Sequence, residues 1–305
     1  MTLRKAAAIA VTAGTVLLAT PVASPAQAVT APTVSAKGAY LLDNATGTKL
    51  FGKYADHERP MASTTKIMTA RVVLSQTGLD LDRKVTIRQA YRDYVTAKGA
   101  STADLRTGDR VTVRQLLYAM MLPSGCDAAY ALADTFGTGD TRSARVKSFI
   151  GKMNKKAADL GLTNTHFDSF DGISTTGANY TTPRDLAKLA RSAMKYSTFR
   201  SVVKTTKTVR YATTSTGGTR TYTWYNTNQL LGSYSGANGI KTGTSTPAGP
   251  CLVFSATRGD KTVIGVVLNA TSRYSDAAKM LDYGFGTSTA PTMQLRRLPA
   301  DAQRD

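Results

Sequence analysis

The spacing of apolar residues changes twice along the chain, and this limits the folds that it can adopt. Residues 39–53 have the pattern of a β-hairpin, and a helix is expected from about 63 to 75. Helical spacing then dominates from about 77 to 205. Strand-like spacing follows and ends before a helix near 275–283; the strands expected there are 206–213, 219–224, 239–246, 251–257 and 261–268. The sequence therefore predicts a sheet built from both ends of the chain, with a helical region inserted between them.

The first 28 residues have the composition of a secretory signal. A short basic start precedes an apolar run from Ala6 to Ala19, and Ala26-Gln27-Ala28 matches a small-x-small cleavage site. A membrane anchor is the alternative, but the run is shorter than the ~20 residues that a spanning helix requires. We therefore expect an exported protein, outside the cytoplasm, in the cell wall or at the outer face of the membrane.

The remainder of the chain predicts one two-part domain over 29–286, with the region 77–205 inserted in it. The last residues, 287–305, are rich in Thr and Pro and then charged, so we expect a flexible tail.

Basic residues outnumber acidic ones, with 39 Lys and Arg against 20 Asp and Glu and a formal net charge of +19. Such an excess favours an anionic partner. Nucleic acid is not expected, because the exported chain has no basic-aromatic binding motif. Anionic wall polymers or the membrane surface fit better. A charge that only keeps the protein soluble is the alternative, since the Lys and Arg residues are scattered.

Few residues are suited to metal or disulfide chemistry. Only His57 and His166 are present, and they form no His-Glu-x-x-His motif, so neither a zinc site nor another cofactor is expected. Cys126 and Cys251 could form one disulfide in an oxidising compartment, although nothing in the sequence indicates that they are close.

The first chemical motif is Ser63-Thr64-Thr65-Lys66, at the start of the predicted helix. Backbone N–H groups there favour developing negative charge. Lys66 lies one turn on, where the two side chains can meet. A serine hydroxyl needs a neighbour that takes its proton, and a neutral lysine can do so when burial and a second cation, such as Lys241, favour that form. Taken alone, the motif favours a helix N-cap at Ser63 and a surface lysine at Lys66; only together with the other motifs does it favour a catalytic pair.

The second and third motifs supply groups of a different kind. Ser124 follows Pro123 in a loop between helices, where a hydroxyl could relay a proton to a leaving amine; the alternative is an N-cap for the next helix. Lys241-Thr242-Gly243-Thr244 lies on a strand, and Gly243 would let a substrate backbone approach closely. The Lys241 and Thr242 side chains could bind a carboxylate. The backbone N–H groups of Thr244 and Ser63 could form an oxyanion hole.

With these motifs in this order, the chain resembles the low-molecular-mass penicillin-binding proteins of the D-alanyl-D-alanine carboxypeptidase family. It is most similar to actinobacterial DD-transpeptidases that carry Cys in place of Asn in the Ser-x-Asn motif. The resemblance spans about 29 to 285. It implies an α/β (α+β) fold, with an antiparallel sheet flanked by helices, an inserted all-helical region and an active site between the two.

The resemblance also implies a reaction. Ser63 would attack the D-Ala-D-Ala bond of peptidoglycan stem peptides, release D-Ala and pass the acyl group to an amine or water, and β-lactam antibiotics such as penicillins would inhibit it. The implied catalytic residues are Ser63, Lys66 and Ser124. The implied substrate-binding residues are Cys126, Lys241, Thr242, Gly243 and Thr244, with Arg273 as a possible further partner of the substrate carboxylate.

Cys126 takes the position of the Asn that holds the substrate amide in relatives. We therefore expect it to be a free thiol that lines the cleft and reacts with thiol-directed reagents. Other classes remain as alternatives: a catalytically weak wall-binding or β-lactam-sensing domain, or a zinc-free amidase or esterase. A β-lactamase is less expected, because no Glu-x-x-x-Asn loop lies between Ser124 and Lys241.

Overall fold

The computed structural model describes residues 1–3, 6–8 and 30–303. The helices and strands all lie within residues 31–305, which form one compact unit. The expected signal and its cleavage site lie almost wholly outside the described residues, so this expectation and the domain boundaries remain predictions. Among the described residues, no helix has the length and apolar character that crossing a membrane requires.

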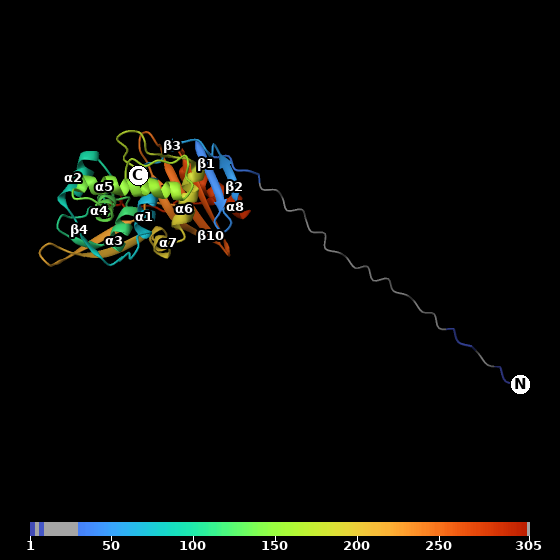
Figure 1. The fold of residues 1–305 in the computed structure, drawn as a ribbon. Helices are drawn as coiled ribbons and strands as arrows, with labels where there is room; N and C mark the ends of the chain where they lie inside the picture. The colour runs from blue at the N-terminus through green and yellow to red at the C-terminus, as the bar shows by residue number, and fades with distance from the viewer. Residues whose placement is uncertain (4–5, 9–29, 304–305) are drawn as a thin grey trace. The chain divides into compact units, whose positions relative to one another are not determined.

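A five-stranded antiparallel sheet joins the two ends of the chain, as expected (Figure 1). Its strand order is β2-β1-β11-β10-β9. The strands are β1 (Gly38–Asp43), β2 (Lys49–Lys53), β9 (Ala237–Gly243), β10 (Cys251–Arg258) and β11 (Lys261–Leu268). Gly265 on β11 makes room for the ring of Phe254 on β10, because a Cβ at this glycine would lie 2.2 Å from the ring. As the strand order shows, the N-terminal strand β1 pairs directly with the C-terminal strand β11.

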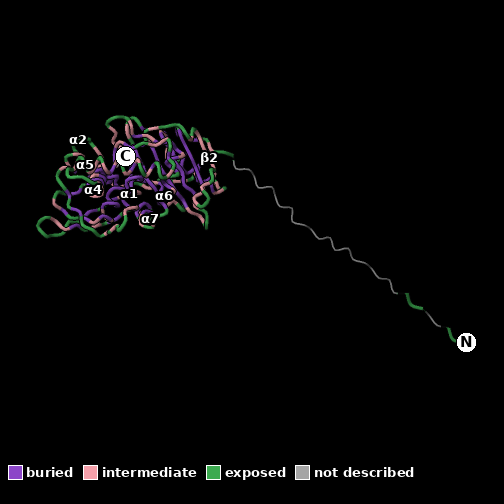
Figure 2. The backbone as a smooth tube through the Cα atoms, viewed as in Figure 1, coloured by how far each residue is buried: buried purple, intermediate pink, exposed green. Residues whose placement is uncertain are grey.

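Both faces of this sheet are buried, because neighbouring side chains of a strand point to opposite faces. On β1, Leu42 belongs to the core shared with α1 (Lys66–Leu74) and α6 (Pro183–Ala193), whereas Leu41 belongs to the core shared with α8 (Arg273–Phe285). Buried residues, purple in Figure 2, run through the sheet and the helices packed against it. The expected antiparallel sheet flanked by helices is confirmed.

The inserted region contains most of the helices. Its core is α4, whose buried residues pack against the helices around it. Thr182 caps α6 through the N–H of Asp185, and Pro183 occupies the first turn, as this sequence predicts. The helices of this region, besides α6, are α2 (Gln89–Lys98), α3 (Val113–Met121), α4 (Cys126–Phe136), α5 (Arg142–Asp159) and α7 (Ser197–Val203).

One expectation about the sheet is wrong. The hairpin of β7 (Lys207–Thr213) and β8 (Thr219–Tyr225) does not extend the main sheet. It joins β4 (Lys84–Thr86) and β5 (Arg110–Thr112) in a separate sheet, ordered β4-β5-β7-β8. Side chains of β8 hold it there: the indole of Trp224 donates to the carbonyl of Ala103 at 2.9 Å. The hairpin is therefore part of the helical region.

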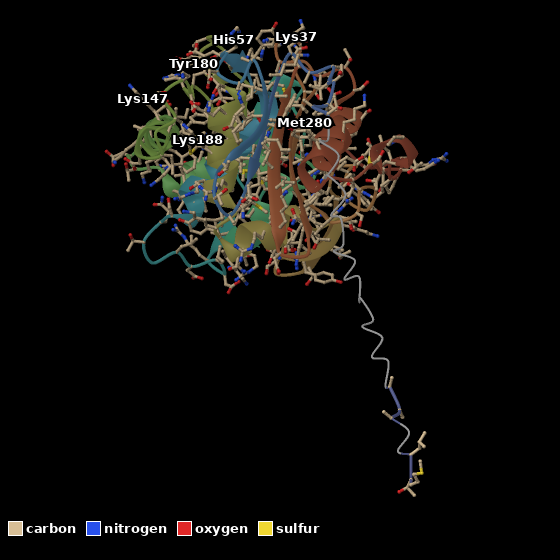
Figure 3. All side chains as sticks on the ribbon, turned by 90° about the vertical axis from the view of Figure 1, so that its right-hand side faces the viewer. Lys37, His57, Lys147, Tyr180, Lys188 and Met280 are labelled. Atoms are coloured by element: carbon tan, nitrogen blue, oxygen red, sulfur yellow. The ribbon has the colours of Figure 1, made fainter. Side chains whose placement is uncertain are left out.

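A short two-stranded ladder includes the residues shortly before Ser63. Its strands are β3 (Arg59–Pro60) and β6 (Tyr180–Thr181). His57 and Tyr180 lie at the same end of the molecule (Figure 3). His166 pairs with Tyr180 through the backbone, and its Nδ1 lies 2.7 Å from the carbonyl oxygen of Ala178. These contacts give His166 a structural role.

The C-terminal segment differs from the expected flexible tail. It contains a short 3-10 helix, η2 (Ala290–Thr292), and the carboxylate of Asp282 accepts hydrogen bonds from the N–H groups of Thr289 and Ala290, both at 2.6 Å. Further along, the guanidinium of Arg296 donates to the carbonyl of Asn226 at 2.7 Å. Sequence composition missed these contacts, because they join polar groups to a distant part of the fold.

We predict that Asp282→Ala frees this segment and lowers the free energy of unfolding by about 2 kcal/mol, as expected for loss of hydrogen bonds to a buried charge. Burial would raise the pKa of Asp282, but the hydrogen bonds that it accepts hold it below its usual value. The stabilisation is therefore present above an ordinary aspartate pKa of about 4 and lost as the pH falls below it. Amide hydrogen exchange of residues 287–290 measures the release; unchanged exchange in the variant would contradict the prediction.

Candidate active site

Ser63 lies in the 3-10 turn η1 (Ala62–Thr65), directly before α1, and is partly exposed. The backbone around it is tightly packed. Ala62 has a positive φ of 47°, which is strained for a residue other than glycine. A Cβ on Gly172 would lie 2.0 Å from the carbonyl oxygen of Ala62, so only glycine fits there. The loop around Gly172 therefore fixes the turn that presents the Ser63 hydroxyl.

Lys66 is fully buried, and its amine meets three groups from distant parts of the chain. Lys66 Nζ lies 2.9 Å from Ser63 Oγ, 3.3 Å from Cys126 Sγ and 2.9 Å from the carbonyl oxygen of Asp171. A surface position for this lysine, the alternative left open by the sequence, is wrong. The amine is instead within direct proton-transfer distance of the Ser63 hydroxyl.

Asp171 was not identified from the sequence. Its carbonyl oxygen accepts from Lys66, while its buried carboxylate accepts from the Tyr94 hydroxyl at 2.8 Å and from the N–H of Ile173 at 2.9 Å. Burial, and then the charge of this carboxylate, raise the pKa of Tyr94. Tyr94 therefore stays a neutral donor that holds the 171–173 loop against Lys66.

Ser124 adopts a left-handed backbone, with φ of 65°. It is fully buried, and its Oγ has no hydrogen-bond partner among the described residues. Helix α4 begins at Cys126 with Gly125 as its N-cap, and no side chain caps it, so the N-cap alternative for Ser124 is wrong. The Ser101 hydroxyl donates to the Ser124 carbonyl at 2.8 Å and supports this conformation. A strained residue with an unpaired buried hydroxyl is typical of a functional position.

Asp127 fixes the other side of the site and was also missed. Its carboxylate accepts from the N–H groups of Ala103 and Leu105, each at 3.0 Å, and from the Thr102 hydroxyl at 2.9 Å. Burial raises the pKa of Asp127 above its usual value, although these hydrogen bonds oppose the shift. Asp127 thus ties the loop after Ser101 to the start of α4.

Strand β9 brings the third motif to the same place. A Cβ on Gly243 would lie 3.0 Å from the backbone nitrogens of Ser63 and Thr64, so the strand approaches the η1 turn closely. Lys241 is buried, and its Nζ lies 3.1 Å from the carbonyl oxygen of Thr242. Thr242 Oγ1 in turn lies 2.6 Å from Thr227 Oγ1. These two side chains are therefore engaged within the protein.

Arg273, at the start of α8, lies beside the end of β9. Its Nη1 donates to Thr244 Oγ1 at 3.0 Å and to the carbonyl of Gly243 at 3.3 Å. Thr244 is exposed, so the two side chains offer a hydroxyl and a guanidinium next to one another.

A cavity of about 530 Å³ opens in front of these groups. Its lining includes Ser63, Cys126 and Thr244, together with Asn179 and the segment 98–101. The buried side chains of Lys66, Ser124, Lys241 and Thr242 do not line it. The arrangement offers a partly exposed hydroxyl in contact with a buried amine, facing a space large enough for a short peptide.

Cys126 and Cys251 are not bridged. Cys126 lines the cavity but is only 1% exposed. Burial raises the pKa of its thiol to about 12, although the nearby Lys66 amine lowers it somewhat. The expected free thiol in the cleft is present, but its expected ready reaction with thiol reagents does not fit this environment.

Comparisons with known proteins agree on one family. A family model described as D-alanyl-D-alanine carboxypeptidase matches residues 25–272. A D-alanyl-D-alanine carboxypeptidase of Streptomyces sp. (strain K15) is 62% identical over 290 residues, which cover 93% of this chain and 99% of the relative. A carboxypeptidase of Bacillus subtilis (strain 168) is 33% identical and matches 82% of this chain, which spans 62% of that relative's length.

Solved structures give the same result for the fold. The crystal structure of the Streptomyces K15 DD-transpeptidase is 64% identical, with a TM-score of 0.83, and the match covers 85% of this chain and 100% of that one. A D-alanyl-D-alanine carboxypeptidase from Mycobacterium tuberculosis H37Rv is 29% identical, with a TM-score of 0.75, and the match covers 90% of this chain and 100% of that one.

We predict that the native Cys126 thiol is alkylated slowly at pH 8, on the order of a thousandfold more slowly than in the unfolded chain, because only the thiolate reacts. The rate should keep rising above pH 9, where an ordinary cysteine levels off. Iodoacetamide labelling followed by peptide mass analysis reports Cys126 and Cys251 separately. Rapid native labelling of Cys126 at pH 7 would contradict the prediction.

Proposed function

The chain belongs to the D-alanyl-D-alanine carboxypeptidase family, and on that basis we propose that Ser63 is the residue through which it cleaves D-Ala-D-Ala. The protein is a serine D-Ala-D-Ala carboxypeptidase/DD-transpeptidase, which acts on peptidoglycan stem peptides and binds β-lactams. The observation that carries the assignment of Ser63 is its 2.9 Å contact with the buried amine of Lys66.

In the first half-reaction, Ser63 Oγ forms a bond to the carbonyl carbon of the penultimate D-Ala, and its proton passes to Lys66 Nζ. The contacts of this amine with Asp171 and Cys126 keep it aimed at the hydroxyl. The tetrahedral intermediate then breaks its C–N bond, and Ser124 relays the proton to the leaving D-Ala amine. The unpaired buried hydroxyl of Ser124 supports this relay.

The negative oxygen of the intermediate is bound by the N–H groups of Ser63 and Thr244. The close approach of Gly243 to the Ser63 nitrogen supports this pairing. In the second half-reaction an amine or water attacks the ester carbon, and Lys66 takes the attacking group's proton. The bond between Ser63 Oγ and the carbonyl carbon then breaks, and Lys66 returns the proton to Ser63 Oγ.

The terminal carboxylate of the substrate is bound at the end of β9. Thr244 and Arg273 meet it directly, because they lie together next to the cavity. Lys241, Thr242 and Gly243 act from within the strand: Lys241 contributes its charge, Thr242 positions it, and Gly243 lets the peptide approach. Cys126, which also lines the cavity, contacts the substrate amide with its protonated thiol, a weaker hydrogen-bond partner than a carboxamide.

Enzymes of this family work on the wall, outside the cytoplasm. We propose that residues 1–28 are the export signal and that the basic surface, with a net charge of +19 over the whole chain, keeps the enzyme near anionic wall polymers or the membrane surface. Family membership favours peptide-bond transfer over the amidase, esterase, β-lactamase and sensing-domain alternatives.

We predict that penicillin labels Ser63 alone. Mass analysis of the digested adduct should place the added mass on the peptide that contains Ser63, and Ser63→Ala should remove it entirely. Ser124→Ala is the matched control: it should still take the label, but more slowly. A label that survives Ser63→Ala would show that another residue is the nucleophile.

We further predict that Lys66→Arg loses at least about a thousandfold in the acylation rate, because a guanidinium is not deprotonated in proteins. Lys241→Arg should be milder, since the charge at the carboxylate site is kept. Stopped-flow acylation by a chromogenic β-lactam measures both variants. Equal losses would contradict the separate roles of the two lysines.

A further inference from the structure

A second cavity lies in the helical region and is lined by none of the residues of the three motifs. It has a volume of about 360 Å³ and shares no lining residue with the active-site cavity. Strand β4, the start of α2, the end of α4 and the first turns of α5 form its walls. Four basic side chains line it: Arg83, Lys84, Arg88 and Arg145.

A single buried carboxylate, Asp134, lies among these cations and accepts one side-chain hydrogen bond on each oxygen. One oxygen accepts from Arg145 Nε at 2.6 Å, and the other accepts from the Tyr91 hydroxyl at 2.6 Å. Arg88 Nε and Arg142 Nε lie 3.9 Å and 3.7 Å from the second oxygen, beyond hydrogen-bond distance. Asp134 therefore fixes Arg145 but leaves the donors of the other two arginines without a hydrogen bond to it.

The remaining charges of the cavity are not compensated within the protein. No described residue forms a hydrogen bond or ion pair with the side chain of Arg83 or Lys84. Asp82, the acidic residue nearest to them in sequence, pairs with Arg114 at 3.5 Å instead. The first turns of α2 and α5 contain no acidic residue. Several cations thus surround a cavity that holds one carboxylate, which favours an anion as the missing partner.

We propose that this cavity binds a phosphate group and that a phosphate-bearing polymer of the cell wall supplies it. Guanidinium groups match phosphate oxygens with paired hydrogen bonds, and arginine is the preferred residue for this task. A cavity of this size encloses a phosphate and its flanking atoms, whereas a membrane would contact a flat or convex basic face. The phosphate site rests on the cavity alone; the wall as its source rests on the proposed function.

The test compares two double variants that remove equal charge. Arg83→Gln/Arg88→Gln removes two exposed cations of the cavity, and Arg88 makes only one distant ion pair, so folding should be retained. Lys204→Gln/Arg297→Gln removes two exposed cations from elements that do not line it. Titration calorimetry with inorganic phosphate and with soluble poly(glycerol phosphate) measures binding. Co-sedimentation with phosphatidylglycerol vesicles is the third arm.

We expect the wild type to bind both phosphate probes, with an affinity that falls as salt is raised. The cavity variant should bind at least about tenfold more weakly, as expected for losing charge-assisted hydrogen bonds, and the control variant should bind as the wild type does. Equal binding by the two variants, or no binding of phosphate by the wild type, would show that this cavity is not a phosphate site. Binding to vesicles but not to the polymer would contradict the proposal that a wall polymer supplies the bound phosphate group.

Penicillin acylation of the wild type is measured in the same samples. Its absence would count against the proposed function without affecting the phosphate result, so the two failures are distinguishable. Thermal unfolding of both variants shows whether a weaker affinity comes from the cavity or from a loosened fold.

Discussion

The burial of one amine imposes the strictest constraint on this structure. A polar group taken out of water must find partners within the protein, and the amine of Lys66 finds them in Ser63, Cys126 and the backbone of Asp171. The three partners come from the turn before α1, from the start of α4 and from a loop that follows α5. Three segments that are distant in sequence are thus aligned around a single nitrogen atom.

The carboxylates near the site act as structural supports. Asp127 accepts a backbone hydrogen bond from the loop after Ser101 and holds it in place. Asp171 does the same for the loop that packs on Ala62 through Gly172. These supports also explain how Ala62 and Ser124 remain in left-handed conformations, each costing of the order of 1–3 kcal/mol. The reacting groups keep their geometry because the segments behind them are held by buried hydrogen bonds.

Sequence reasoning reached the parts of this structure that local patterns determine. The hairpin of β1 and β2, the capped start of α6 and the one-turn separation of Ser63 from Lys66 follow from periods and caps. It did not reach features that depend on distant partners. A period of two identifies β7 and β8 as strands but does not say which sheet they join. Asp127, Asp171 and Asp282 are single acids in unremarkable contexts, and their importance lies in the backbone groups that they meet.

The pairing of β1 with β11 has a consequence for how the chain reaches this state. Residue 38 lies opposite residue 268, so the central ladder of the main sheet closes a loop that contains nearly the whole domain. Contacts between such distant residues form slowly. A chain that is delivered from its N-terminus cannot complete this ladder until its last strand has emerged. Until then β1 has an unpaired edge, and such an edge is open to association with other chains.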